Sequence, residues 1–290
     1  MSLFSPGDAT DQSYLNVRDS ADARIATIRE HTEQLWVEYE CHADPHFLTE
    51  CRRDFHARFW EMYLVVTLMR LGHKVTCPKP GPDAGIVVEG RRIWFEAVAP
   101  KPGADGAPDR VPEMRMDEMN WVPNEQIILR YLNAVRTKLT EQYPRWREAG
   151  IVAEQDALVI AVNPKEIAHE LVDTIPPRIV QVAFPIGPPT VSLEGRSGKV
   201  LEEVYQRRVA IPKANGAVVP TGAFLHDTGV SLSGLLCSRV DVANYPAQLG
   251  AVFQFVPNPL ARAQVPEAFR LPGTYFPVAR DENGLIVNLR

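Results

Sequence analysis

Asp83 and Glu96 are the two side chains whose types and spacing point most directly to chemistry. The strand-like stretches that carry them are separated only by Glu89-Gly90, a pair typical of a two-residue hairpin turn. Counting back along both strands from that turn brings Asp83 opposite Glu96. Facing Cβ atoms lie about 4.5–5.5 Å apart, and like charges there are destabilising. We therefore expect a cation between them, with Mg²⁺ or Mn²⁺ as the cofactor, because hard divalent ions bind through one or two carboxylates plus substrate phosphates.

The alternative for this pair is that the two acids do not meet. A bulge or a longer turn would shift the register by one residue and move Glu96 to the opposite face of the hairpin, toward solvent.

Periodic apolar residues predict the elements that must position the pair. We expect helices over residues 21–40, 47–71 and 124–143, strands over 73–77 and 157–162, and a long loop over 100–123. Gly72 is expected to end the second helix, Asn124 to cap the third and Pro144 to end it. The second helix has apolar residues stepping by three and four, and the continuous apolar run at 157–162 suits a central strand covered on both faces.

The remaining chain predicts a less regular C-terminal part. Prolines are frequent beyond residue 164, and short strands are expected over 179–184, 207–211, 231–238 and 251–256. The predicted fold is α/β, a central mixed sheet flanked by helices, with a Pro-rich, mainly β C-terminal extension. The predicted divisions are a mobile leader over 1–20, a core over 21–164, and an extension of the sheet or a small second part over 165–290.

Composition narrows the class of protein. With 290 residues, 45% of them hydrophobic, the chain can bury a large core. No apolar run is long enough to span a membrane and no signal peptide is seen, so we expect a cytoplasmic protein with no membrane partner. Four irregularly spaced cysteines argue against a disulfide framework.

The charge distribution bears on the partner. A net charge of −5 argues against a protein that coats nucleic acid non-specifically. Residues 51–110 nevertheless hold ten basic and seven acidic side chains, so the segment around the carboxylate pair is net basic. This pattern favours a phosphate partner there, although basic side chains also form ordinary solvated faces.

Over residues 47–164, the order of helix, strand, hairpin, loop, helix and buried strand resembles the core of the PD-(D/E)xK nuclease superfamily, the restriction-endonuclease-like fold. Pro82-Asp83 matches the family's Pro-Asp pair, Glu96 matches its second acid, and Glu61 matches the Glu often found on its first helix. The resemblance implies a Mg²⁺-dependent endonuclease-like hydrolase acting on DNA, with Asp83, Glu96 and Glu61 as metal ligands.

The chain departs from that motif at Val98, where the family has lysine. The motif lysine orients the attacking water and stabilises charge on phosphorus, which a neutral side chain cannot do. In the superfamily such residues migrate to neighbouring elements, and Lys138 on the third helix is the best replacement, with Lys101 second. Lys138 could equally snorkel to the surface. Arg130 and Gln142 are less specific phosphate ligands.

Glu61 has a second interpretation as well. It lies where a polar helical stripe turns apolar, so it needs a partner, and Arg58 three residues earlier offers an ordinary ion pair. The functional alternative is that Glu61 binds a metal ion or its water.

Other motifs carry less weight. Residues Cys41, His42, His46, Cys51 and His56 cluster loosely without the paired spacing of a zinc site, so packing is the expected role and zinc the minor one. Gly229–Ser233 fails the nucleophile-elbow pattern, and no phosphate loop or dinucleotide fingerprint is present.

Three functions follow. The leading hypothesis is a metal-dependent phosphodiesterase acting on DNA, in which Asp83 and Glu96 bind the metal, Glu61 helps to position metal or water, and Lys138 replaces the motif lysine. The second is a catalytically inactive, nuclease-like module that binds protein or nucleic acid. The third is an interaction protein in which the acids are incidental and the Pro-rich half makes the contacts.

Overall fold

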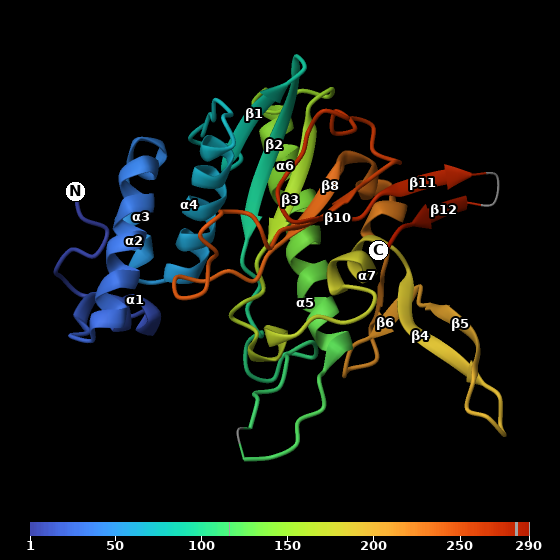
Figure 1. Ribbon diagram of the computed structural model, residues 1–290. Coiled ribbons are helices and arrows are strands. Elements are labelled where there is room, and N and C mark those ends of the chain that lie inside the picture. The colour runs from blue at the N-terminus through green and yellow to red at the C-terminus, as the bar shows by residue number, and fades with distance from the viewer. Residues whose placement is uncertain (116, 282–283, 290) are drawn as a thin grey trace.

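The centre of the molecule is a six-stranded sheet in the order β1-β2-β3-β8-β9-β10 (Figure 1). The computed structural model describes residues 1–115, 117–281 and 284–289. The strands of the sheet are β1 (Ala84–Val88), β2 (Arg91–Val98), β3 (Ala157–Val162), β8 (Gly234–Cys237), β9 (Gln254–Pro257) and β10 (Thr274–Tyr275). Strands β2, β3 and β8 are parallel, β1 and β9 are antiparallel to their neighbours β2 and β8, and β10 is parallel to β9. The predicted mixed sheet is confirmed, and β3 is buried along its whole length.

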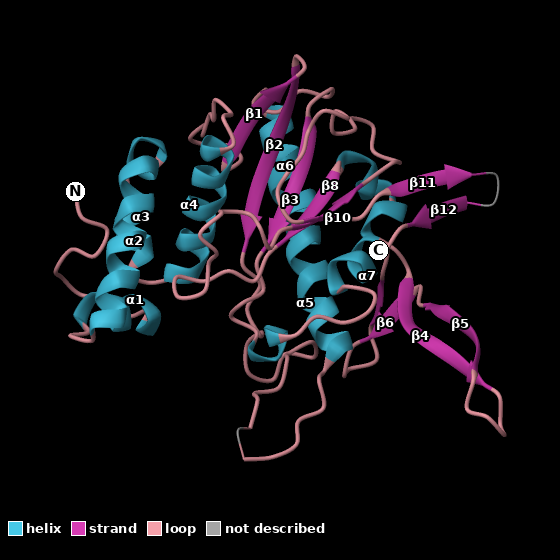
Figure 2. Ribbon diagram, viewed as in Figure 1, coloured by secondary structure: helices cyan, strands magenta, loops and turns pink. Residues whose placement is uncertain are grey.

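Helices cover both faces of this sheet (Figure 2). On one face lie α1 (Gln12–Asp19), α2 (Ala23–Tyr39), α3 (Phe47–Cys51) and α4 (Phe55–Arg70); on the other lie α5 (Asn124–Thr137), α6 (Tyr143–Glu148) and α7 (Arg178–Ala183). Helix α4 is anchored by Trp60, whose Nε1 donates to the Ala161 carbonyl of β3 at 2.8 Å. Because side chains alternate along a strand, Phe95 of β2 packs in the α4 core while Trp94 packs in the α5 core.

The N-terminal segment differs from the predicted mobile leader. It contains α1, which Asp11 caps by accepting from the Tyr14 N–H at 2.9 Å. Leu3 and Tyr14 are fully buried, and the Tyr14 hydroxyl donates to the Leu3 carbonyl at 2.9 Å. The segment therefore belongs to the core on the α4 face.

Two predicted helices are interrupted. The expected helix over 47–71 breaks between α3 and α4, where Asp54 leaves helical geometry (φ −150°, ψ 69°). In place of the expected helix over 124–143, α5 ends at Thr137, a π-helical turn spans Lys138–Gln142, and α6 follows. Pro144 does not end it but stands in the first turn of α6, where a missing N–H costs nothing.

Two predicted strands are absent. The stretch 73–77 contributes a single β-bridge, between Thr76 and Gly85. The stretch 179–184 is instead helical, as α7. Every residue of α7 is buried, and a short apolar run reads the same in a buried helix as in a buried strand.

The C-terminal half completes the sheet, because β8 pairs directly with β3. Three hairpins lie outside the sheet: β4 (Ile186–Leu193) with β5 (Val200–Arg207), β6 (Ala210–Pro212) with β7 (Val218–Pro220), and β11 (Val278–Asp281) with β12 (Gly284–Val287). Figure 1 shows the first and the last projecting from the body. None of the described helices is long and apolar enough to cross a membrane.

A buried ionic network joins the two halves of the chain. The Arg178 guanidinium of α7 is 1% exposed and lies 3.0 Å from Oε2 of Glu170, which is also 1% exposed. The same Glu170 oxygen lies 2.8 Å from Nε of Arg239, just beyond β8, and Oε1 accepts from the Tyr131 hydroxyl of α5 at 3.0 Å. Arg178 also donates to Asn124 Oδ1 at the start of α5, at 2.7 Å.

Candidate active site at the β1–β2 hairpin

The predicted register of the hairpin is confirmed. Strand pairing runs from Val88 opposite Arg91 to Ala84 opposite Phe95, which leaves Asp83 at the next position, beside Glu96. Glu89 and Gly90 both have positive φ angles, 50° and 75°, as a two-residue type I′ turn requires.

Asp83 is fixed to the neighbouring strand by its own side chain. It is partly buried just ahead of β1, and its Oδ2 accepts from the Ala97 N–H of β2 at 2.7 Å. That bond holds the carboxylate at the hairpin edge next to Glu96 and satisfies one of its oxygens.

Glu96 meets a lysine from the end of α5, on the same side of the sheet. It is 4% exposed on the α5 face of β2, and its Oε1 lies 2.5 Å from the Nζ of Lys138. Lys138 Nζ also donates to Gln142 Oε1 at 3.0 Å, across the π-helical turn. The other carboxylate oxygen of Glu96, Oε2, is buried and has no hydrogen-bond partner among the described residues.

Glu61 enters from helix α4 and is 1% exposed. Its Oε2 lies 2.7 Å from Arg58 Nη1, so the ordinary ion pair expected from the sequence is present. Its Oε1 accepts from the Tyr39 hydroxyl at 2.6 Å and lies 3.5 Å from Lys79 Nζ. Glu61 is thus fully partnered, with one side toward the carboxylate pair.

The three carboxylates influence one another electrostatically. Burial, followed by the charge of Glu96, raises the pKa of Asp83 to about 7. Burial and the charge of Asp83 raise the pKa of Glu61 to about 7, with Arg58 opposing. Burial also raises the pKa of Glu96, although Lys138 opposes that shift. The site therefore contains acids that take up or release a proton near neutral pH.

The remaining candidates lie elsewhere. Lys101 Nζ is 3.0 Å from Asp54 Oδ2, at the start of α4, so it does not replace the motif lysine. Arg130 donates to the Lys101 carbonyl at 2.8 Å and pairs with Asp109 at 3.1 Å, which ties down the loop that follows β2.

Val98 occupies the last position of β2 and pairs with Val162 of β3. Its half-buried side chain packs against the apolar core on the α5 face, two residues beyond Glu96 on the same side of the strand. A lysine at this position would thus emerge beside Glu96, where Lys138 arrives instead.

Sequence reasoning missed Tyr39 and Lys79, the two further partners of Glu61. Tyr39 ends α2 and Lys79 precedes β1, so only tertiary packing brings them to α4. An aromatic hydroxyl at a helix end and a loop lysine carry no local signal for such a contact.

The cysteine and histidine cluster does not form a metal site in the described part of the chain. Cys51 is buried and Cys41 exposed, both as free thiols. No group of three or more His, Cys, Asp or Glu side chains among the described residues is placed to hold a metal ion. A Mg²⁺ site needs fewer protein ligands than such a group provides, because one or two carboxylates suffice when water and phosphate supply the others. The unpartnered Glu96 oxygen beside Asp83 fits that need.

No protein-family model, curated protein or solved structure matches this chain significantly.

Proposed function

We propose that this protein is a metal-dependent phosphodiesterase acting on DNA. The observation that carries the proposal is the meeting of Lys138 with Glu96 at 2.5 Å, beside Asp83 and with one Glu96 oxygen left unpartnered. A carboxylate pair with an adjacent lysine is the constellation that the PD-(D/E)xK resemblance implies, with the lysine supplied by the end of α5 in place of β2.

Asp83 and Glu96 would hold Mg²⁺ or Mn²⁺, and Glu61, whose pKa the charge of Asp83 helps to raise, would orient the ion or its water. A divalent ion bound there supplies Lewis acidity toward a phosphate oxygen and lowers the pKa of bound water. The raised pKa values of Asp83 and Glu61 support this assignment, because a bound cation compensates for the burial and the neighbouring negative charge that raise them.

Lys138 would stabilise the negative charge that develops on phosphorus. Its ammonium is held by two acceptors, Glu96 Oε1 and Gln142 Oε1, so its position is fixed before substrate binds. An ammonium group has a third N–H, which remains for a phosphate oxygen or the attacking water.

The charges around the site favour a phosphate-bearing substrate. Lys79 and Arg58 lie at its α4 side, 34% and 28% exposed, and the segment 51–110 is net basic in an acidic chain. That distribution favours local binding at the site over general coating of nucleic acid.

The test is cleavage of supercoiled plasmid and of single-stranded DNA in Mg²⁺ and in Mn²⁺. We expect cleavage by the native protein and a loss of at least about 100-fold in Asp83→Asn, Glu96→Gln and Lys138→Met. Lys165→Met is the matched control, because Lys165 is a partly buried lysine paired with Asp241 at 3.1 Å and with none of the three carboxylates. Full activity in Asp83→Asn would overturn the proposal.

A second candidate function is a nuclease-like binding module without catalysis. The observation in its favour is Val98, which leaves the strand itself without a lysine. DNA binding by the native protein without cleavage in either metal, and without a heat of Mn²⁺ binding, would support this function.

A further inference from the structure

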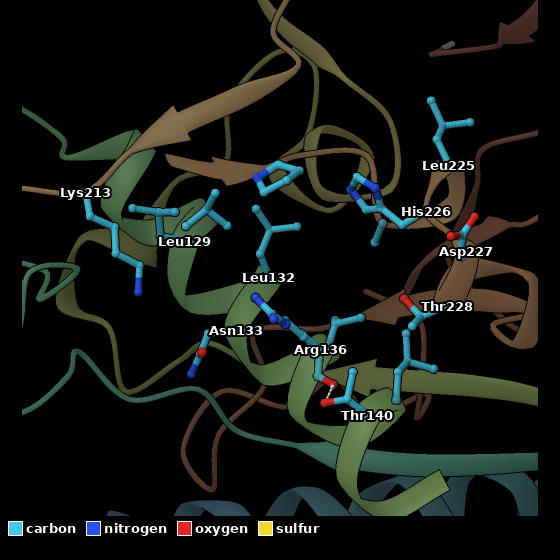
Figure 3. A pocket seen from close by; sticks show the side chains of 15 residues that line it. Leu129, Leu132, Asn133, Arg136, Thr140, Lys213, Leu225, His226, Asp227 and Thr228 are labelled. Atoms are coloured by element: carbon cyan, nitrogen blue, oxygen red, sulfur yellow. Dashed lines mark hydrogen bonds between the residues drawn. The ribbon is translucent and has the colours of Figure 1, made fainter. Parts of the chain in front are cut away.

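A cavity lies beside α5, and none of the three carboxylates of the proposed active site lines it (Figure 3). Its volume is about 670 Å³, and its walls are α5 with the first part of the π-helical turn on one side and the segment 213–228 on the other. Leu139 and Thr140 line it, whereas Lys138 of the same turn donates to Glu96 and to Gln142. The cavity is therefore distinct from the proposed active site, and its volume is within the range of small-molecule pockets.

The floor of this cavity is part of the protein core. Val135, Leu139 and Ala223 line it and are 1%, 5% and 8% exposed, respectively. All three belong to the apolar core between α5 and the sheet. An apolar group that enters the cavity is thus removed from water and packs on apolar side chains. This burial is favourable by about 25 cal/mol per Å² of apolar surface.

The cavity wall carries a cationic side chain, Arg136, that is not paired with any described residue. Arg136 is exposed on α5, and its guanidinium makes no ion pair or hydrogen bond to any described residue. Figure 3 shows Arg136 rising from α5 on one side of the cavity and His226 on the opposite side. By contrast, Lys213 in the same cavity is already 3.6 Å from Asp109 Oδ2.

His226 adds a polar group of fixed orientation. Its Nε2 lies 2.9 Å from the Thr221 carbonyl, which can only accept, so Nε2 carries the proton. The other ring nitrogen, Nδ1, makes no hydrogen bond to a described residue and acts as an acceptor in the neutral ring.

We propose that this cavity binds a small organic monoanion with an aliphatic body, the body on the Val135 and Leu139 floor and the carboxylate on Arg136. A guanidinium pairs with a carboxylate through two parallel hydrogen bonds, which suits an unpaired arginine beside an apolar floor. Asp227 on the same rim disfavours a doubly charged phosphate. The lining includes no Phe, Tyr or Trp side chain on which a nucleobase would stack, which separates this ligand from the proposed DNA substrate.

The test is calorimetric titration of the full chain with octanoate, octanol and octylamine. Octanoate should bind, octanol more weakly, and octylamine not at all. Arg136→Gln should weaken octanoate binding at least 10-fold and change octanol binding less than 2-fold. Arg24→Gln, which removes an exposed arginine from α2 on the opposite side of the sheet, is the matched control and should bind octanoate as the native protein does.

A second variant tests the cavity itself. Thr140 is exposed at the rim, so Thr140→Trp fills the opening without disturbing the core, and it should abolish binding of both octanoate and octanol at an unchanged melting temperature. Equal binding of octanoate and octylamine, native affinity in Arg136→Gln, or no heat with octanoate up to about 5 mM would each overturn the proposal.

Discussion

At the scale of single residues, Glu96 has two oxygens in very different situations. Oε1 is paired with Lys138, while Oε2 is buried without a partner in the described structure. An unsatisfied buried acceptor costs about 1–3 kcal/mol, more when it is charged. Such a cost is common at binding sites, where the missing partner is the ligand.

The raised pKa of Asp83 gives a prediction for stability against pH. Its pKa is raised from 3.8 to about 7, so the folded state binds the proton more tightly than the unfolded chain does. The bound proton therefore stabilises the folded state at low pH. The free energy of unfolding falls as pH rises from about 4 to about 7, and above pH 7 the stabilisation by this proton is lost. Asp83→Asn removes the charge but keeps an acceptor for Ala97. We expect it to be more stable than the native protein by about 1–3 kcal/mol at pH 8, without added metal, and no more stable at pH 4.

Urea unfolding at the two pH values measures the difference. A gain that is the same at both would show that the Asp83 carboxylate is not the group that titrates. Asp105→Asn removes an exposed carboxylate from the loop after β2 and is the control, with little change expected at either pH.

At the scale of elements, the lysine of the proposed site comes from a helix, whereas the motif expected from the sequence would carry it on a strand, at Val98. Both routes lead to the α5 side of β2, because Val98 and Glu96 point the same way from that strand. What the proposed site requires is therefore an ammonium group beside Glu96, whichever element carries it.

This equivalence predicts a rescue. Lys138→Met should lose cleavage, and the double substitution Val98→Lys with Lys138→Met should regain at least about 10-fold over the single variant, since the new ammonium emerges beside Glu96. Cleavage rates at equal enzyme concentration and melting temperatures for all three proteins give the answer. If a folded double variant recovers no cleavage, an ammonium on β2 cannot replace that of Lys138, and the position of Lys138 in the π-helical turn is itself required.

The sequence predicted some elements well for physical reasons. Glu89-Gly90 satisfies a turn with two positive φ angles, which few residue pairs do, and the register followed from it. The apolar run of β3 has the length and β-branching of a strand buried on both faces. Asp83 and Glu96 were therefore placed together from local signals alone.

Other features depend on tertiary contacts and carry no local signal. The break at Asp54 and the π-helical turn after Thr137 occur inside uninterrupted helical patterns. Helix α7 has the β-branched composition of a strand, and because all its residues are buried, no exposed polar face marks it as a helix. The partners Tyr39 and Lys79 reach Glu61 only after α2 and the loop before β1 have packed against α4.

At the scale of the whole molecule, the ionic network around Glu170 joins α5, α7 and the end of β8. The C-terminal half is thus part of the same folded unit as the hairpin. Because α5 also carries the turn that presents Lys138, this network stabilises the helix on which the proposed active site depends.

Removal of one partner from this network should be costly. Arg178→Met removes one of the two guanidinium partners of buried Glu170, which keeps Arg239 and the Tyr131 hydroxyl, and leaves Asn124 Oδ1 without its donor. We expect a loss of about 2–4 kcal/mol in the free energy of unfolding. Arg262→Met is the matched control, because Arg262 pairs with Glu154 at the same 3.0 Å but with both side chains more than half exposed. It should cost less than about 1 kcal/mol.

Chemical unfolding of the two variants measures both values. Equal losses would show that the Glu170 network contributes no more than a surface ion pair does.

The central claim is that Asp83 and Glu96 form a divalent metal site, and calorimetric titration with Mn²⁺ tests it most directly. Because the pKa of Asp83 is about 7, binding at pH 6.5 should release protons, and the affinity should rise between pH 6 and pH 8. We predict one ion per chain, a heat that depends on the ionisation enthalpy of the buffer, and loss of binding in Asp83→Asn but not in Lys165→Met. A native protein that gives no heat at millimolar Mn²⁺, or an Asp83→Asn variant that binds as the native protein does, would contradict the account.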